Sequence, residues 1–598
     1  MAEEKSTKTG AEHINWDLSD LYGSIHDPRL EEDREAVVKK AEAFAEKYKG
    51  KISQLDAGAF AQLLKAYEDI LEIIGRIGSF AHLVWSVDTS KTENGKLVQQ
   101  ANELSSEVHQ KLVFLDVEWL NMEDSQADRL IDSDELSHYR HYLESSRRYK
   151  SHILSEKEEQ ILSAKSVTGR SAWNRYFDET LGAARFELDG EELTEQEVLS
   201  KLHDPDRGLR KRAHASLTDK FRELSRTLTF VFNTLLADKY TNDKLRNYPD
   251  WISSRNLANE IDDATVRLLI DAVTSNYGLV QRFYRLKRRL LGYDKLYDYD
   301  RYAPLLESRE EIHWDKAKEM VLKSYTEFHP EMGSIAGKFF EHQWIDAAIK
   351  PGKRGGAYSA GTVPSVHPYV FMNFDGKIRD VQTLAHELGH GVHQYLSRKQ
   401  GILQSGTPLT TAETASVFGE MLVFQNLMQQ LSDPKERLAL LLSKIDDTIA
   451  TVFRQVSMNR FEDAMHVKRR KHGELSTEEF SDLWRTTQEA LYGDAVELTE
   501  SYNLWWCYIP HFLHTPGYVY AYAFGELLVL ALYEEYMHSS NGFSDKYLRM
   551  LEAGGSDWPE RIVSKVGLDI TQPDFWDKGL RNIEKMIKQA EELADQVK

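Results

Sequence analysis

The strongest constraint on the fold is a helix pattern that recurs along the chain. Asp27-Pro28 places a capping carboxylate before a proline, an order that favours a first helical turn. Apolar residues follow at steps of seven, four, three and four, namely Leu30, Val37, Ala41, Phe44 and Tyr48. Because this spacing lines one face of a helix, we predict an amphipathic helix that ends at Gly50.

The same pattern returns in the C-terminal half. Asp433-Pro434 opens a long amphipathic segment that we expect to end near Gly473. Ser476-x-x-Glu479 is a capping box that opens the next helix. Strand signals are few by comparison. We therefore predict a mainly α fold with a small β-sheet.

Two short segments carry the strand signals. Asp189-Gly190 is a hairpin turn signal inside the first. The second, residues 369–374, is rich in β-forming residues and precedes Asp375-Gly376, another turn signal. We therefore expect a second hairpin that returns at residues 377–378, directly before a helix over residues 381–396.

Small residues dominate Gly355–Gly361, upstream of that hairpin. Such a composition is required where a second backbone approaches closely, and it is also typical of a flexible surface loop. The residues leave both interpretations open. The first hairpin signal precedes a charged helical stretch that contains Asp204-Pro205, and we place a boundary between them, near residue 200. No Gly/Ser-rich linker, low-complexity tract or solenoid repeat is evident, so we expect residues 1–200 and 201–598 to pack together.

Charge and cysteine content limit the partners and the compartment. The 598 residues include 75 Lys and Arg against 96 Asp and Glu, a net charge of -21, which argues against nucleic acid or an anionic membrane as the main partner. The single cysteine, Cys507, excludes an intramolecular disulfide. The N-terminus lacks a signal-peptide layout and no stretch of about 18 uninterrupted apolar residues follows. We expect a cytoplasmic protein.

The predicted helix over residues 381–396 contains His386-Glu387-Leu388-Gly389-His390. Because His386 and His390 are four residues apart, both imidazoles leave the same face and can bind one ion. Glu387 is rotated by about 100 degrees and can instead reach a water on that ion. In zinc peptidases the ion held in this way polarises the scissile carbonyl, while the glutamate acts as general base.

Two glycines interrupt the same helix. Gly389 and Gly391 each cost a helix up to about 1 kcal/mol relative to alanine. An ordinary surface helix gains nothing from such residues. We therefore expect another element to pack closely against this one.

A catalytic zinc normally has three protein ligands and one open position. A metzincin-like third histidine would stand at position 396, which is Leu396, so that class is excluded. His393 lies on the same helix as the first two ligands, and one helix cannot readily supply three ligands to a tetrahedral ion. We therefore interpret His393 as a residue behind the ligands or on the surface. The next helix offers Glu413 and Glu420 on one side, and spacing leaves the choice between them open.

Eight segments spread over nearly the whole chain match one known family. They are Trp16–Tyr22, Gly352–Tyr358, Thr383–Gly391, Glu413–Ser416, Ile509–Phe512, Tyr518–Tyr522, Gly554–Ser556 and Pro573–Trp576. In these segments the chain resembles the thimet oligopeptidase-like zinc metallopeptidases, and within them the bacterial oligoendopeptidase F branch.

The resemblance implies a role for particular residues. It makes Glu413 the third ligand, with one zinc ion per chain, and Glu420 a residue behind the ligands. It also implies that a histidine and tyrosines between His511 and Tyr522 bind the oxyanion and the substrate. His511 and Tyr518 are our candidates for catalysis, because His511 lies between prolines on a segment that we expect to be irregular.

Five further residues are candidates for binding substrate. They are Gly356, Ala357, Tyr358, Tyr520 and Tyr522. The first three belong to the glycine-rich segment, which the resemblance makes an edge strand that pairs with the substrate backbone. Tyr520 and Tyr522 have an equally good interpretation as packing residues at the start of a helix over residues 524–536.

The resemblance implies a two-lobed helical metallopeptidase that encloses a deep substrate channel, with residues 201–598 as the catalytic domain. The expected activity is zinc-dependent cleavage of internal bonds in short oligopeptides, by a zinc-bound water that Glu387 activates, in intracellular peptide turnover. Oligopeptides are the expected partners, and the oligomeric state stays open. The alternatives are a metallocarboxypeptidase or aminopeptidase on a related scaffold, and a peptide-binding protein with a degenerate site.

Overall fold

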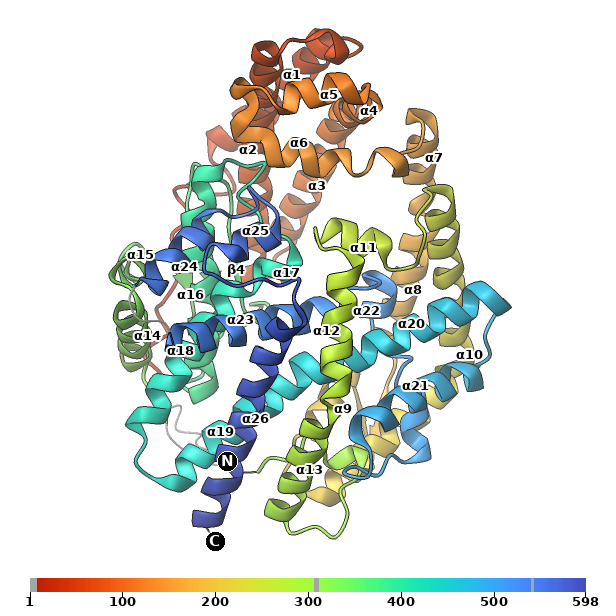
Figure 1. The fold of residues 1–598 in the computed structure, drawn as a ribbon, viewed down its shortest axis with the longest axis vertical. Coiled ribbons are helices and arrows are strands. Elements are labelled where there is room, and N and C mark those ends of the chain that lie inside the picture. Colours follow the sequence, from red (N-terminus) through yellow and green to blue (C-terminus); the bar gives the residue numbers. More distant parts are fainter. Residues whose placement is uncertain (1–7, 306–310, 539–541, 598) are drawn as a thin grey trace. The chain divides into compact units, whose positions relative to one another are not determined.

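The computed structural model describes residues 8–305, 311–538 and 542–597 (Figure 1). Helix accounts for 71% of the chain and strand for 3%, which confirms the prediction of a mainly α fold with small sheets. The chain forms two compact units of three segments each. Unit 1 comprises residues 1–153, 309–429 and 535–569, and unit 2 comprises residues 154–308, 430–534 and 570–598.

Unit 1 combines an N-terminal group of helices with a three-stranded sheet and its flanking helices. Its elements are α1 (Pro28–Tyr48), α2 (Ala57–Val87), α3 (Thr92–Leu112), α4 (Phe114–Asn121), α5 (Asp124–Ile131), α6 (Arg140–Arg147), α14 (Trp314–Phe328), α15 (Pro330–Glu341), β3 (Ile345–Asp346), β4 (Tyr358–Ala360), β5 (Tyr369–Phe371), α16 (Ile378–Ser397), α17 (Leu409–Ala412), α18 (Thr414–Gln430), α24 (Phe543–Glu552) and α25 (Pro559–Ser564).

The described residues of unit 2 form helices and a two-stranded hairpin. Its elements are α7 (Glu156–Ser166), α8 (Arg170–Ala183), β1 (Phe186–Leu188), β2 (Glu191–Leu193), α9 (Glu195–Lys201), α10 (Arg207–Leu245), α11 (Ser253–Ala258), α12 (Asp263–Ser275), α13 (Tyr277–Leu291), α19 (Pro434–Ile449), η6 (Ala450–Arg454), α20 (Gln455–His472), α21 (Thr477–Tyr492), α22 (His511–His514), α23 (Tyr520–His538) and α26 (Pro573–Gln596). The last turn of α23 belongs to unit 1.

The boundary predicted near residue 200 lies within α9. The chain passes between the two units at other points, after residues 153, 308, 429, 534 and 569. The division into residues 1–200 and 201–598 stays a prediction.

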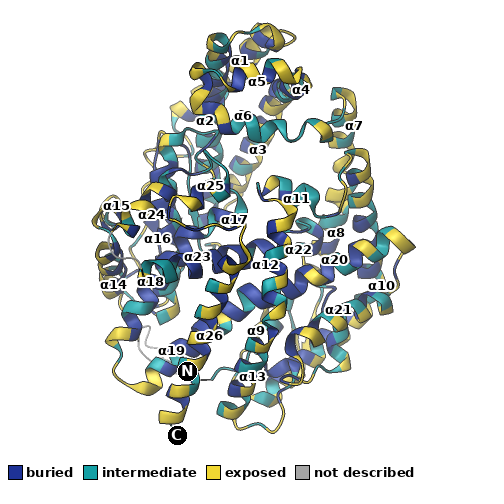
Figure 2. Ribbon diagram, viewed as in Figure 1, coloured by how far each residue is buried: buried dark blue, intermediate teal, exposed yellow. Residues whose placement is uncertain are grey.

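The helices read from their capping residues are confirmed. The Asp27 carboxylate accepts a hydrogen bond from the Arg29 N–H at the start of α1, and all five apolar residues predicted for its inner face are buried. Asp433 caps α19 in the same way, and Ser476 forms the predicted capping box of α21. The long segment from Asp433 to Gly473 is interrupted only by the π-helical turn η6. Figure 2 shows these buried stripes along the helices.

The hairpin predicted at residues 369–378 is wrong. β5 lies between β3, to which it is parallel, and β4, to which it is antiparallel. The turn signal after it instead prepares the start of α16, because the N–H groups of Asp375 and Lys377 donate to the Asp380 carboxylate. The other predicted hairpin, β1 and β2 around Asp189-Gly190, is confirmed.

Close packing around α16 is confirmed at both of its glycines. A Cβ atom on Gly389 would lie 2.4 Å from the Ala415 carbonyl oxygen of α18, and one on Gly391 would lie 2.6 Å from the Phe339 ring of α15. From α14, the Tyr325 hydroxyl donates to the Ala385 carbonyl at 2.5 Å. β4 and β5 contact α16 as well. The helix with the two histidines is therefore held by three helices and the sheet.

Among the described residues, α2 is a helix long and apolar enough to cross a membrane by length and composition. About a third of its most apolar window, 33%, is buried within the protein. Core helices of soluble proteins meet the same criteria, so this is weak evidence for a membrane span.

In unit 2, a buried carboxyl group holds the turn that precedes Tyr518. Gly517 has φ +74° and donates its N–H to Glu462 of α20 at 2.9 Å. A Cβ atom at this glycine would lie 3.2 Å from the Arg255 side chain. Burial raises the pKa of Glu462 to about 8, against the opposing effects of the Gly517 N–H and the Arg255 charge. This side chain therefore keeps its proton at neutral pH.

We predict that Gly389→Ala destabilises the protein by at least about 2 kcal/mol, because the added methyl group meets backbone atoms that cannot move aside. Gly78→Ala is the matched control, since Gly78 lies inside α2 with no atom within 4 Å of a Cβ at that position. The control should be neutral or stabilising by up to about 1 kcal/mol. Urea unfolding measures both, and equal effects would contradict the packing described.

We predict that Glu462→Gln becomes increasingly stabilising, relative to the original chain, as the pH rises from about 4.5 to about 8. In this window the unfolded chain has lost the Glu462 proton while the folded chain retains it, so the contribution of Glu462 to the free energy of unfolding falls as the pH rises, and the Glu462→Gln variant lacks this contribution. The slope is at most about 1.4 kcal/mol per pH unit. Urea unfolding at about pH 5 and about pH 8 tests this; a pH-independent difference refutes it.

Candidate metal centre

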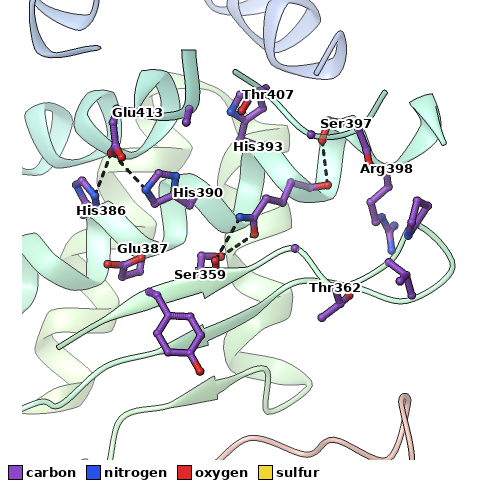
Figure 3. A pocket seen from close by; sticks show the side chains of 18 of the residues that line it. Ser359, Thr362, His386, Glu387, His390, His393, Ser397, Arg398, Thr407 and Glu413 are labelled. Carbon is purple, nitrogen blue, oxygen red and sulfur yellow. Dashed lines mark hydrogen bonds and ion pairs between the residues drawn. The ribbon is translucent and has the colours of Figure 1, made fainter. Parts of the chain in front are cut away.

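Three side chains from two helices meet in unit 1. Nε2 of His386 and Nε2 of His390 each lie 3.3 Å from Oε2 of Glu413, which stands at the junction of α17 and α18 (Figure 3). The candidate ligand atoms of all three lie within 4.8 Å of one another. Two imidazoles and one carboxylate are a donor set that zinc takes in catalytic sites. These residues fit a zinc ion.

The carboxylate of Glu413 is oriented by its own helix. The Ser416 hydroxyl donates to Oε2 of Glu413 at 2.7 Å. The neighbouring carbonyl of Thr414 accepts a hydrogen bond from the Tyr547 hydroxyl of α24 at 2.9 Å. Because the close contact at Gly389 sets the distance between α16 and α18, the carboxylate reaches both histidines.

The charges of the histidines and of Glu413 shift the pKa values of this site in opposite directions. Burial opposes protonation of His386, but the pairs with Glu413 and Glu420 outweigh it and raise the His386 pKa to about 10. Burial likewise acts to raise the pKa of Glu413, yet the two histidines hold it far below its usual range. Glu413 is thus an anion suited to a cation.

Glu387 lies beside this group and is only 6% exposed. Burial raises its pKa, while the charges of His386 and His390 and a hydrogen bond from the Ser359 backbone oppose the shift. A glutamate whose pKa moves toward neutrality is suited to accepting and returning a proton. In Figure 3 Glu387 points away from Glu413, toward the strand that carries Ser359.

A cavity of about 560 Å³ adjoins the three candidate ligands. Its lining comes from α16, the segment before α18, and the glycine-rich segment that contains β4. β4 is an edge strand of its sheet. Gln394 of α16 ties this strand to the helix, since its side chain accepts from the Ser359 hydroxyl at 2.8 Å (Figure 3).

Of the predicted substrate-binding residues, Ala357 and Tyr358 line this cavity. Tyr358 also stacks on Phe371 of β5, with ring centroids 5.0 Å apart. Gly356 has φ +85°, and its carbonyl accepts from Asn373 at 3.1 Å. The segment is therefore held in place, in contrast to a free surface loop.

The two remaining candidates near the ligands occupy different positions. Oε2 of Glu420 lies 3.5 Å from Nδ1 of His386, the ring nitrogen that faces away from Glu413. His393 is 6% exposed and lines the cavity, and burial lowers its pKa to about 4. His393 does not belong to the group of candidate ligands found among the described residues.

His511, Tyr518 and Tyr522 gather in unit 2. The rings of His511 and Tyr518 stack at 5.8 Å, and the Tyr522 hydroxyl lies 3.5 Å from Nε2 of His511. His511 opens the short helix α22, so the expectation of an irregular segment at this residue is wrong. Tyr520 stands apart, fully buried, with its hydroxyl bonded to Asn256 and Asn259 at 2.8 Å each. That geometry fits the packing interpretation of Tyr520.

Sequence reasoning missed Ser416 and Gln394 as supports of the site. Gln394 follows His390 by four residues, the same step that separates the two histidines, so spacing could have indicated it. Ser416 follows Glu413 by three residues, within reach on one helical turn. Glu462 carried no local signal, because its importance depends on its burial against a distant turn.

Comparison with known sequences agrees with this geometry. Residues 200–582 match the sequence profile of peptidase family M3, and residues 118–186 match that of oligopeptidase F. Oligopeptidase PepF of Bacillus subtilis is 28% identical, over 100% of this chain and 91% of that protein. Group B oligopeptidase PepB of Streptococcus agalactiae is 27% identical, over 97% of each.

Solved structures share the fold. A putative peptidase from Chlamydophila abortus superposes with a TM-score of 0.84 at 25% identity, covering 97% of this chain and 98% of the other. Oligoendopeptidase-F from Enterococcus faecium gives a TM-score of 0.73 at 25% identity, with 95% and 99% covered. The profile match extends over more than half of the chain. The chain therefore belongs to peptidase family M3, as an oligoendopeptidase F-like metallopeptidase, a hydrolase.

Proposed function

We propose that this protein is a zinc-dependent endopeptidase that hydrolyses internal peptide bonds of short oligopeptides. The observation that carries the proposal is the meeting of His386, His390 and Glu413 beside the buried carboxyl group of Glu387. Relatives named oligoendopeptidase F, from Lactococcus lactis subsp. cremoris and Enterococcus faecium, support oligopeptides as the substrate class.

We assign one zinc ion per chain to His386, His390 and Glu413. When bound, zinc polarises the scissile carbonyl and lowers the pKa of water at its open position toward about 7. Glu420 beside Nδ1 of His386 supports the proposal, because a carboxylate behind a ligating imidazole fixes the ring orientation.

Glu387 is the proposed general base. It takes a proton from the attacking water and gives one to the leaving amine. Its burial supports this role, since a raised pKa brings the carboxyl group closer to the pH at which the enzyme works.

His511 and Tyr518 are the proposed donors to the oxyanion. The motif likeness from Ile509 to Tyr522 supports this, as does the clustering of His511 with Tyr518 and Tyr522 in unit 2. A donor aimed at the developing negative charge contributes about 3 kcal/mol in a site that excludes water. Tyr522 is the alternative to Tyr518.

The edge strand β4 is the proposed dock for the substrate backbone. Ala357 and Tyr358 line the cavity beside the candidate ligands, and Gly356 precedes them in a positive-φ turn. Backbone pairing with an edge strand gives affinity with little dependence on side chains, which suits varied peptides. The deep channel that the resemblance implies stays a prediction. We also propose a cytoplasmic location, which the low cysteine content supports, because Cys507 has no second cysteine with which to form an intramolecular disulfide.

We predict that the protein cleaves a peptide blocked at both ends, because an endopeptidase needs no free terminus. Glu387→Gln should lower kcat by about 10²–10⁴-fold and still retain about one zinc per chain, as measured by metal analysis. Glu341→Gln, an exposed carboxyl group of α15, is the matched control and should leave kcat unchanged. Trimming of free ends alone would favour the exopeptidase alternative. Zinc retention without any cleavage would favour a binding protein.

We predict that Tyr518→Phe lowers kcat by about 10²-fold or more and changes KM little, as expected for an interaction made in the transition state. Tyr522→Phe measures the alternative donor in the same assay. Tyr176→Phe, an exposed tyrosine of α8, serves as control. A loss confined to Tyr522→Phe would transfer the role to that residue, and full activity of both variants would remove tyrosine from the mechanism.

A further inference from the structure

A second cavity, of about 690 Å³, lies within unit 2. Its walls come from α7, α8, α10, α11 and α20 and from residues 512–516. The volume falls in the range of small-molecule sites, which is about 300–1,000 Å³. None of the residues assigned to the metal centre belongs to this cavity.

His466 is the buried polar side chain of this cavity that has no partner. It is 1% exposed, and neither ring nitrogen makes a hydrogen bond. Its ring stacks on Trp251 with centroids 4.6 Å apart. Burial, together with the charges of Arg470 and Lys239, lowers its pKa well below the usual value, so the ring is neutral. Because buried polar groups in proteins are almost always hydrogen-bonded, this imidazole is suited to a ligand with an acceptor oxygen.

Positive charge exceeds negative charge around the cavity. Five cationic side chains line it, against three carboxylates, namely Lys165, Arg170, Lys239, Arg246 and Arg255 against Glu159, Asp238 and Asp243. This is the reverse of the whole chain, whose net charge is -21.

Two of the three carboxylates are already neutralised. Asp243 accepts from both Lys239 and Arg470. Glu159 accepts from Arg246 through two hydrogen bonds of 2.6 and 2.8 Å. The cationic surplus argues against a divalent metal and for an anion.

Part of the wall is apolar. Leu162, Leu235, Leu236, Phe512 and Leu513 line the cavity. An inorganic anion would leave this surface without contacts, whereas an organic anion with an aliphatic body would cover it. The wall and the charges together match a carboxylate next to an apolar side chain.

The cavity is joined to the segment that bears His511 and Tyr518. Arg170 donates to the His514 carbonyl at 2.7 Å, and Arg255 donates to the Pro516 carbonyl at 3.4 Å. A carboxylate bound by these arginines would therefore lie against residues 512–516.

We propose that this cavity is a binding site for the C-terminal end of a peptide, in which His466 and Arg170 hold the carboxylate and the leucine-rich wall holds the last side chain. The choice of a peptide rests on the proposed function. The choice of an apolar carboxylate rests on the cavity alone, and a free organic acid would share that chemistry.

The test is calorimetric titration of the zinc-loaded protein with N-acetyl-leucine and with its uncharged amide. The acid should bind at one site of the cavity, and the amide should bind at least about tenfold more weakly, because it lacks the charge. His466→Phe keeps the stacking on Trp251 but removes the N–H, and Arg170→Gln removes an exposed cation. Each substitution should therefore lower the affinity for the acid by about tenfold. Arg175→Gln on the same helix, outside the cavity, is the matched control.

Equal affinity for acid and amide would overturn the proposal, as would a lack of saturable binding. If both His466→Phe and Arg170→Gln leave the affinity for the acid unchanged, the ligand binds elsewhere, for example at the metal. That result would also overturn the proposal. A kinetic arm compares a peptide acid with its C-terminal amide. If the amide has a higher KM than the acid, and this difference disappears in His466→Phe, the cavity binds the end of a peptide. Equal KM values assign the cavity to a free acid and refute the proposal of a peptide ligand. If the protein binds N-acetyl-leucine as described but cleaves no peptide, the proposed activity fails and the carboxylate site stands.

Discussion

The arrangement of the metal centre depends on the close approach of α16 and α18. The absence of a side chain at Gly389 lets the backbone at Ala415 and Ser416 come against α16. This contact places Glu413, directly before the first turn of α18, within reach of both histidines of α16. A helix with the same histidines but a larger residue at position 389 would keep two ligands and lose the third. The glycine within the motif is therefore as necessary to the site as the two histidines.

Features that depend on local interactions could be predicted from the sequence. The start of α1 follows from Asp27-Pro28, and its buried face follows from the spacing of its apolar residues, because both are decided within one helix. For the same reason the spacing of His386 and His390 was sufficient to predict a shared face. The hairpin of β1 and β2 forms because Asp189 and Gly190 both accept positive φ, which is also a local property.

Features that depend on distant residues could not be predicted in this way. β5 pairs with strands from elsewhere in the chain, so its β-forming residues did not reveal its partners, and the turn signal at Asp375-Gly376 led into a helix cap. Spacing alone left Glu413 and Glu420 equivalent, since the angle between α16 and α18 decides which one faces the ligand nitrogens. Burial of Glu462 and His466 inside unit 2 left no trace in the pattern of α20.

The central claim is that His386, His390 and Glu413 hold one zinc ion. An anomalous-difference map from crystals of the purified protein, recorded at the zinc absorption edge, tests it most directly. We predict one strong peak per chain, about 2.0–2.2 Å from Nε2 of His386, Nε2 of His390 and a carboxylate oxygen of Glu413. A peak bound by Glu420 in place of Glu413, or no peak among these three residues in protein that contains zinc, would contradict it.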